Sequence, residues 1–270
     1  MWLANIFFFL LGATVGSFLN VVSDRLPRGK SLLFPPSHCF SCNNRLTARD
    51  LIPVFSYIWL RGKCRHCSAR IPLRILLVEL FAGLLFVLLL WHYGLSWNWL
   101  ATAIYSSLFL ALSVIDFEQQ ILPNRLIYPF LVIAPVIFML IGPNILSIDP
   151  DLNFFHQWIS NMYLANLVSS VSGAFSGLLI LLIPLLFLRG GMGIGDLKLT
   201  MLIGMITGFP LVFISVFISV ILGGLIAGIL LLTGVKKRKD AIPFGPFLCL
   251  GALTTLLWGS NILSWYIGLM

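Results

Sequence analysis

Long apolar runs separated by short polar segments dominate the sequence. A run of about 20 apolar residues can cross the roughly 30 Å hydrocarbon core of a bilayer as one helix. Eight runs predict membrane helices, at residues 2–22, 76–92, 98–115, 126–142, 162–188, 197–208, 211–232 and 243–266. The sixth run is short, so we expect it to be packed inside protein or joined to the glycine-rich segment before it. The pattern predicts an all-α polytopic membrane protein with about eight transmembrane helices.

Composition and the polar segments refine this organisation. Apolar residues make up 59% of the chain and charged residues only 10%, as in membrane proteins. The first run has no basic residue before it and no small-residue cleavage site after it, so we expect a retained helix rather than a signal peptide. The chain then divides into a first transmembrane helix (1–22), a small cytoplasmic module (23–75) and a seven-helix membrane domain (76–270).

The basic residues predict the topology. If the first helix runs from outside to inside, all 17 Lys and Arg lie on the same side of the membrane. They are ten residues within 25–74, then Arg125, Arg189, Lys198 and residues 236–239. The positive-inside rule makes that side cytoplasmic, so both termini lie outside. Topology and contact with anionic lipid account for the net charge of +8, and we expect no nucleic-acid partner.

Four cysteines in the polar module have the spacing of a metal site. Cys39-x-x-Cys42 and Cys64-x-x-Cys67 are separated by 21 residues, close to a zinc-ribbon spacing. Paired thiolates of this kind close a tetrahedral Zn²⁺ site, and the metal supplies folding free energy that a small apolar core cannot. Disulfides are the alternative, although thiols stay reduced in the cytoplasm. We therefore expect a structural zinc ribbon.

Two aspartates lie at the ends of apolar runs. Asp116 ends the third run, and Asp196 follows a segment with four glycines in six positions. Two neighbouring carboxylates share a proton, so that one can activate water while the other polarises a carbonyl. We expect Asp196, at a helix start, to hold the charge and Asp116, at a helix end, to carry the proton. Gly193 and Gly195 are expected to leave the backbone free to bind an extended peptide.

The acidic residues also permit roles outside catalysis. In one alternative, the two aspartates are unrelated helix caps. In another, they form the proton relay of a coupled transporter, whose acids belong near the bilayer midplane. Glu79, Asp116 and Asp196 all fall at cytoplasmic helix ends, which favours an enzyme. Glu79, in the second run, either forms an ion pair with Arg74 or Arg25 or has a binding role.

A series of motifs along nearly the whole chain resembles the type IV prepilin peptidases. The first is Gly16-Ser-Phe-Leu-Asn-Val-Val, whose small residues also predict a helix-packing face. The others are Arg25-Leu-Pro, the four cysteines, Leu60-Arg-Gly-Lys-Cys64, Pro72 to Leu80, Asp116 to Asn124, Gly191-Met-Gly-Ile-Gly-Asp196 and Pro243-Phe-Gly-Pro246. The motif that ends at Asp196 resembles the GxGD signature of the family. Phe40 departs from the proline usual after the first cysteine.

The resemblance implies a bifunctional enzyme of the bacterial inner membrane. It implies removal of a leader peptide from prepilins or pseudopilins at the cytoplasmic face, for type IV pili or type II secretion. It then implies methylation of the new N-terminal amine by S-adenosylmethionine. The cleavage residues carry over as Asp116 and Asp196. The region around Gly62 and Lys63 resembles the part tied to methyl transfer, and we expect Glu79 to bind or deprotonate the amine. A peptidase without methyltransferase activity is the alternative within the family.

Overall fold

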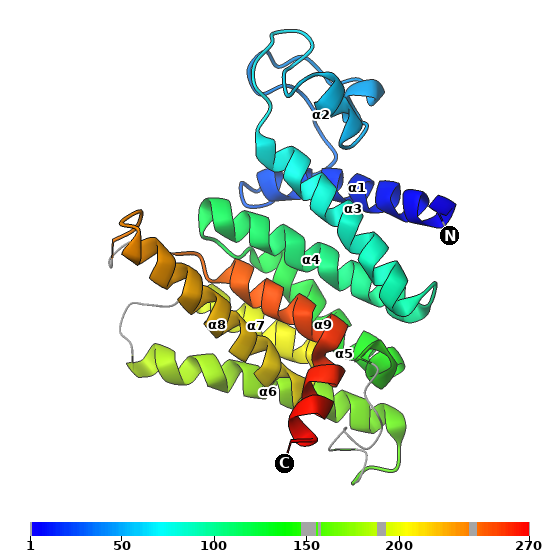
Figure 1. Cartoon of the computed structure of the whole chain (residues 1–270), viewed down its shortest axis with the longest axis vertical. Coiled ribbons are helices and arrows are strands. Elements are labelled where there is room, and N and C mark those ends of the chain that lie inside the picture. Colours follow the sequence, from blue (N-terminus) through cyan, green and yellow to red (C-terminus); the bar gives the residue numbers. More distant parts are fainter. Residues whose placement is uncertain (1, 147–154, 156–157, 188–192, 238–241, 270) are drawn as a thin grey trace. The chain divides into compact units, whose positions relative to one another are not determined.

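The computed structural model describes residues 2–146, 155, 158–187, 193–237 and 242–269. Within these residues the regular elements are helices, which confirms the all-α class. They are α1 (Trp2–Arg25), η1 (Ala48–Leu51), α2 (Phe55–Trp59), α3 (Leu73–Tyr93), α4 (Trp97–Gln119), α5 (Asn124–Leu146), α6 (Met162–Phe187), α7 (Ile194–Thr207), α8 (Leu211–Leu232) and α9 (Gly245–Ile267) (Figure 1). The chain forms two compact units, Met1–Trp99 and Leu100–Met270.

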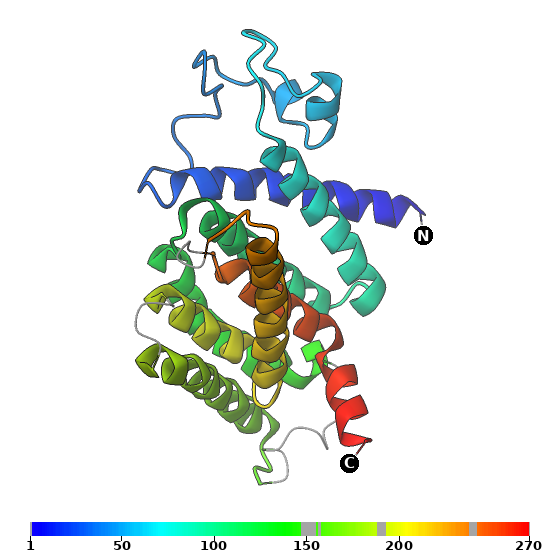
Figure 2. The same cartoon turned by 60° about the vertical axis from the view of Figure 1, so that its left-hand side comes forward.

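The first unit is built on the crossing of α1 and α3 (Figure 2). Gly12 and Gly16 let the two backbones approach closely, as small residues do between membrane helices. A Cβ on Gly16 would lie 2.8 Å from the Cα atom of Glu79, and a Cβ on Gly12 would lie 2.6 Å from the carbonyl oxygen of Ala82. The predicted packing face of the first helix is therefore used against α3.

The polar module follows α1 in the chain and contains η1 and α2. Two five-residue turns in it share one backbone pattern. In the first turn, the N–H of Cys39 donates to the carbonyl oxygen of Asn44, and the N–H of Asn43 donates to the carbonyl oxygen of Cys39. In the second turn, the N–H of Cys64 donates to the carbonyl oxygen of Ala69, and the N–H of Ser68 donates to the carbonyl oxygen of Cys64. Asn43 and Ser68 both have positive φ angles, of 55° and 57°. The two Cys-x-x-Cys segments are thus equivalent turns.

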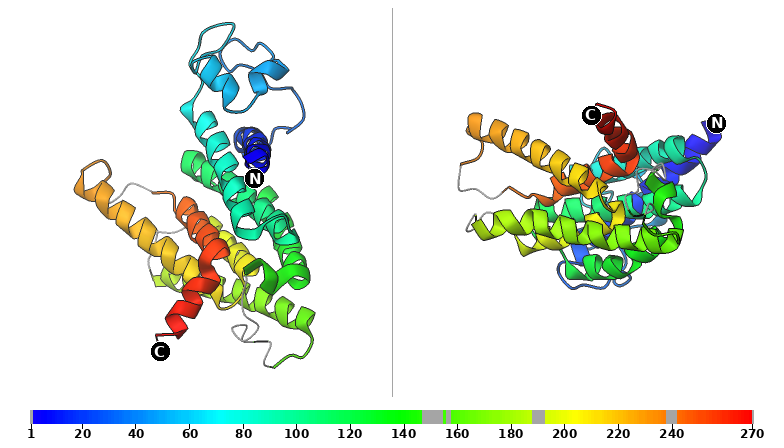
Figure 3. Two further views of the ribbon diagram at one scale, coloured as in Figure 1. Left: turned by 45° about the vertical axis from the view of Figure 1, so that its right-hand side comes forward. Right: turned by 90° about the horizontal axis from the view of Figure 1, so that it is seen from below.

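The second unit encloses α7. Leu199, Leu202, Ile203 and Ile206 of this helix are fully buried among side chains of the surrounding helices. α7 contacts α5, α6, α8 and α9 (Figure 3). Gly173 of α6 and Gly204 of α7 meet backbone to backbone, so neither position has room for a side chain. The fourth helix, α4, supplies the rest of this unit from Leu100 onward.

α7 is shorter than the helices formed by the other predicted spans. Seven helices in the described part of the chain are long and apolar enough to cross a membrane. α7 has 14 residues, or about 21 Å of helix, which is shorter than the roughly 30 Å hydrocarbon core. The sixth apolar run therefore forms an internal helix, as its length suggested, and is not one of the candidate spans.

Candidate active site

Asp116 is held at the end of α4 by the start of α9. Its carboxylate is buried, with 6% of the residue exposed. The backbone N–H of Gly245 donates a 2.9 Å hydrogen bond to Oδ2 of Asp116. A Cβ on Gly245 would lie 2.6 Å from the same oxygen, so only glycine fits here without moving the carboxylate. The sequence contained the Pro243-Phe-Gly-Pro246 motif, but nothing in it identified this contact.

Asp196 lies in the first turn of α7 and faces the backbone before it. The N–H of Gly193, at the N-cap, donates a 3.3 Å hydrogen bond to Oδ2 of Asp196. Gly193 has an extended backbone, and a Cβ there would lie 3.7 Å from the carboxylate. Gly195 lies over Leu122, where a Cβ would come within 3.2 Å of that side chain. The earlier part of the glycine-rich segment, residues 189–192, falls outside the described residues.

Contacts between side chains join the two aspartate motifs. Lys198, two residues after Asp196, donates to Oδ1 of Asn124 over 3.0 Å and to the hydroxyl of Tyr128 over 3.1 Å. Asn124 begins α5, directly after the turn that follows Asp116. Together with the contact of Gly195 and Leu122, these bonds hold the start of α7 against the connection between α4 and α5.

The two carboxylates lie close enough to interact. Burial raises the pKa of Asp196 to about 6, the charge of Asp116 adds to the rise, and the hydrogen bond from Gly193 opposes it. Both carboxylates also lie within electrostatic range of the buried Cys249 thiol in α9. The structure therefore brings together the two aspartates that the sequence placed 80 residues apart.

The hydrogen bonds at the two carboxylates favour the reverse of the protonation state that was expected from the helix ends. The expectation gave the charge to Asp196 and the proton to Asp116. However, Asp116 accepts the shorter hydrogen bond, from a backbone N–H at the start of α9, which stabilises a carboxylate. Asp196 accepts the longer hydrogen bond, of 3.3 Å, from the N–H of Gly193. We therefore assign the charge to Asp116 and the shared proton to Asp196.

The contact of Gly245 with Asp116 gives a sharp test of this geometry. On the expectation that Asp116 is one of the two cleavage residues, Gly245→Ala should lower the rate of peptide cleavage by about 10²-fold, because the added methyl group displaces the Asp116 carboxylate. The measurement is the cleavage rate of a synthetic prepilin. Gly224→Ala and Gly228→Ala, on α8, are matched controls, since a Cβ at either position meets nothing within 4 Å. Equal activity of Gly245→Ala and the controls would contradict the positioning role.

The four cysteines of the module form a cluster that can hold a metal ion. The Sγ atoms of Cys39, Cys42, Cys64 and Cys67 all lie within 4.8 Å of one another. The Sγ atoms of Cys39 and Cys67 are 3.8 Å apart, which is about the separation that four sulfurs adopt at 2.3 Å from a tetrahedral Zn²⁺. All of these cysteines are free thiols, so the disulfide alternative is not realised.

Backbone hydrogen bonds in the two turns favour the thiolate form of Cys39 and Cys64. Backbone hydrogen bonds from Cys42 and then Ser41 lower the pKa of Cys39 to about 6. Equivalent bonds from Cys67 and His66 lower the pKa of Cys64. One sulfur from each turn is therefore prepared as a metal ligand by its own backbone.

The residues expected to act in methyl transfer all lie in the first unit. Gly62 has a positive φ of 68° in the turn before Cys64, and Lys63 forms an isolated bridge with Arg70. Glu79 is 4% exposed, and its Oε2 accepts a 2.7 Å hydrogen bond from the N–H of Val54.

The ion-pair alternative for Glu79 is wrong. Arg74 pairs instead with Asp24 over 2.9 Å, and Arg25 donates to the carbonyl oxygens of Ser31 and Leu32. Within the described chain, Glu79 makes no ion pair. Its described partners are the N–H of Val54 and the hydroxyl of Ser17.

The helical fold, with seven candidate spans in the described part of the chain, defines a multi-pass membrane protein. Residues 10–93 match the bacterial peptidase A24 N-terminal domain, and residues 103–228 match the type IV leader peptidase family. The chain is a member of the type IV leader peptidase family.

Individual relatives match over nearly the whole chain. A protein of Aeromonas hydrophila named prepilin leader peptidase/N-methyltransferase is 32% identical over 98% of this chain and 94% of its own length. Proteins of the same name from Pseudomonas putida and Bacillus subtilis (strain 168) are 33% and 29% identical, over 94% and 96% of this chain and 90% and 96% of their own lengths. No solved structure matches the chain.

Proposed function

We propose that this protein removes the leader peptide from type IV prepilins and pseudopilins and then methylates the new N-terminal amine with S-adenosylmethionine. The observation that carries this proposal is the interaction of Asp116 with Asp196, both within residues 103–228, the part that matches the peptidase family. The names of the full-length relatives support the same pair of activities. No part of the match supports the transporter alternative.

Cleavage uses the two aspartates in different protonation states. Asp116, as the carboxylate, takes a proton from a water molecule that attacks the scissile carbonyl. Asp196, carrying the shared proton, donates a hydrogen bond to the carbonyl oxygen and stabilises the developing charge. Asp116 then passes its proton to the leaving amine. The exposed backbone of Gly193 and the neighbouring Gly195 align the peptide as an extended strand.

The four cysteines hold a structural zinc ion in this proposal. Of the apolar residues from 26 to 72, only Val54 and Cys64 are buried, so packing alone supplies little stability to the module. A Zn²⁺ ion bound by four thiolates would supply the missing free energy of folding. The metal has no part in either reaction.

Methyl transfer takes place in the first unit, which contains Gly62, Lys63 and Glu79. This unit has a cavity of about 630 Å³, a volume typical of cofactor sites. S-adenosylmethionine supplies an activated methyl group there. The attacking amine must first lose a proton, which the buried Glu79 carboxylate accepts. A peptidase without the second activity remains the alternative.

The proposed topology follows from the distribution of charge. The chain crosses the bacterial inner membrane several times, with the active site on the cytoplasmic face and both termini outside. This topology requires that the short α7, packed among the other helices, also leads the chain from one face of the membrane to the other. Its functional parts are the first helix (1–22), the zinc module (23–75) and the membrane domain with the aspartates (76–270). Its partners are prepilins and membrane lipid, without nucleic acid.

The two activities are tested together with a synthetic prepilin and mass detection of the new N-terminus. We expect cleavage with or without S-adenosylmethionine, and a product one methyl group heavier only when the cofactor is present. Cleavage with no methylation under any condition would favour the peptidase-only alternative. An absence of cleavage with every prepilin tested would contradict the proposed function.

A further inference from the structure

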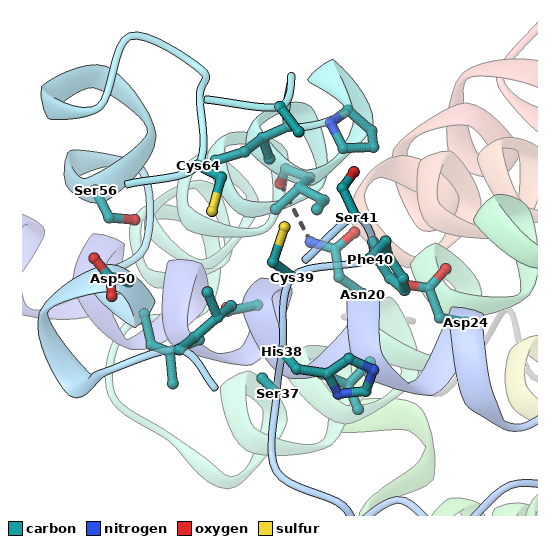
Figure 4. A pocket seen from close by; sticks show the side chains of 18 of the residues that line it. Asn20, Asp24, Ser37, His38, Cys39, Phe40, Ser41, Asp50, Ser56 and Cys64 are labelled. Carbon is teal, nitrogen blue, oxygen red and sulfur yellow. Dashed lines mark hydrogen bonds between the residues drawn. The ribbon is translucent and has the colours of Figure 1, made fainter. Parts of the chain in front are cut away.

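The cavity of the first unit is lined by residues of α1, of the four-cysteine module and of the start of α3. Ser17, Asn20 and Glu79 line it from the two long helices, and Cys39 and Cys64 line it from the module. Charged side chains of both signs complete the lining, among them Asp24, Arg25, Arg28, Asp50 and Arg65. Figure 4 shows Asn20 and Asp24 of α1 around the same cavity as the two cysteines.

Asn20 is buried with one unused acceptor. Only 5% of the residue is exposed. Its Nδ2 donates to the carbonyl oxygens of Gly16 and Ile75, over 3.3 and 3.2 Å, so both amide hydrogens are engaged. Its Oδ1 has no hydrogen-bond partner among the described residues. A buried carbonyl oxygen left in this state costs about 1–3 kcal/mol, unless a ligand donates to it.

Glu79 supplies a second acceptor beside the first. Its carboxylate accepts the N–H of Val54 at one oxygen and interacts with the Ser17 hydroxyl. On α1, Asn20 lies one turn after Gly16, and Gly16 packs against the Cα atom of Glu79. On α3, the hydrogen-bond partner of Asn20 is Ile75, which lies one turn before Glu79. The two side chains therefore lie on adjoining turns of the α1–α3 crossing.

These two acceptors select a cationic donor. A carboxylate and an amide oxygen that share one cavity match the three N–H groups and the positive charge of a primary ammonium ion. We propose that Asn20 and Glu79 bind the new N-terminal ammonium group of the cleaved substrate. This inference rests on the proposed methyltransferase function and assigns it a substrate-binding residue, Asn20.

The assignment fits the proton balance of the reaction. The bound ammonium transfers one proton to the Glu79 carboxylate, which leaves a neutral amine. The amine lone pair then forms the new C–N bond as the C–S bond of the sulfonium donor breaks. Asn20 Oδ1 accepts a hydrogen bond from the amine throughout, so the lone pair points away from this oxygen.

The test measures binding as well as activity in the full-length protein. Unmethylated mature pilin peptide and its Nα-acetylated form are titrated into wild type, Asn20→Ala, Asn20→Asp and Glu79→Gln. We expect wild type to prefer the free amine. Asn20→Ala and Glu79→Gln should raise the Kd of that peptide about tenfold, since about 1.4 kcal/mol corresponds to a factor of ten. Asn20→Asp keeps the acceptor and should retain binding.

Controls separate this inference from misfolding and from failure of the proposed function. Asn5→Ala, on α1 but outside the cavity lining, should bind and cleave like wild type, and every variant should still unfold in a cooperative thermal transition. Wild type that binds the free amine but never methylates it would contradict the methyltransferase proposal alone. Equal binding of free and acetylated peptide by wild type and Asn20→Ala would overturn the inference.

The methionyl part of S-adenosylmethionine also carries a primary ammonium group. Two compounds distinguish the ammonium group of the cofactor from that of the peptide. S-adenosylhomocysteine has the amino-acid part with its ammonium group, and methylthioadenosine lacks it. We expect Asn20→Ala to leave the affinity for both nucleosides unchanged. A selective loss of S-adenosylhomocysteine binding, with peptide binding intact, would overturn the assignment to the substrate and place the cofactor at Asn20.

Discussion

Asp116→Asn and Asp196→Asn are each expected to lower the rate of leader cleavage by about 10³-fold or more, since each removes a group that transfers or shares a proton. The effect is the largest we expect from a single substitution, because the carboxylates act as a pair and neither alone can activate water and polarise the carbonyl. The measurement is single-turnover cleavage of a synthetic prepilin, followed by mass analysis of the product.

Two controls make the result specific. Glu118→Gln removes an exposed acid two residues from Asp116 and should cleave like wild type. Both aspartate variants should still methylate a peptide that has already been cut, because the residues assigned to methyl transfer lie in the first unit. If cleavage survives either aspartate substitution, the catalytic role is wrong and the two aspartates are helix caps.

Removal of the metal is expected to have the second largest effect. In the double variant Cys39→Ser/Cys64→Ser, we expect loss of bound zinc, proteolysis within the module and loss of methyl transfer. Structural zinc contributes about 10–16 kcal/mol in isolated zinc-finger peptides, far more than the sparse apolar contacts of this module can replace. Zinc content, limited proteolysis and methylation of pre-cut peptide are the three measurements.

Histidines beside the ligands provide the matched comparison. His38→Ala and His66→Ala change neighbours of Cys39 and Cys67 and should keep the full zinc content, because four sulfurs already complete the site. Cleavage should fall less than methyl transfer in the cysteine variant. A purified wild-type protein that is folded and free of zinc would contradict the structural role of the metal.

Much of the fold could be predicted because membrane helices are long apolar runs. Seven of the eight predicted runs became helices of spanning length, and the short one became α7. Helix ends were less predictable: α4 continues through Asp116 to Gln119, because an amphipathic end can extend past the apolar run. The cysteine spacing predicted the cluster, since equivalent turns bring paired thiols together regardless of the intervening chain.

The partners of the functional side chains could not be predicted in the same way. Gly245 reaches Asp116 across 129 residues through a backbone N–H, a group that every residue except proline carries. Asn20 looked like part of a packing face, and only the engagement of both its amide hydrogens isolates Oδ1. The partner of Glu79 was a backbone N–H of Val54 rather than an arginine. Such contacts depend on tertiary packing, which the pattern of apolar residues along the sequence does not specify.

The division of the chain into two compact units has a kinetic consequence. The residues assigned to cleavage lie in Leu100–Met270, and those assigned to methyl transfer lie in Met1–Trp99. The product of one unit is thus the substrate of another on the same polypeptide. On this assignment both activities come from one translation product and are always made in equal amounts. The capacity to methylate new N-termini then rises in step with the capacity to produce them.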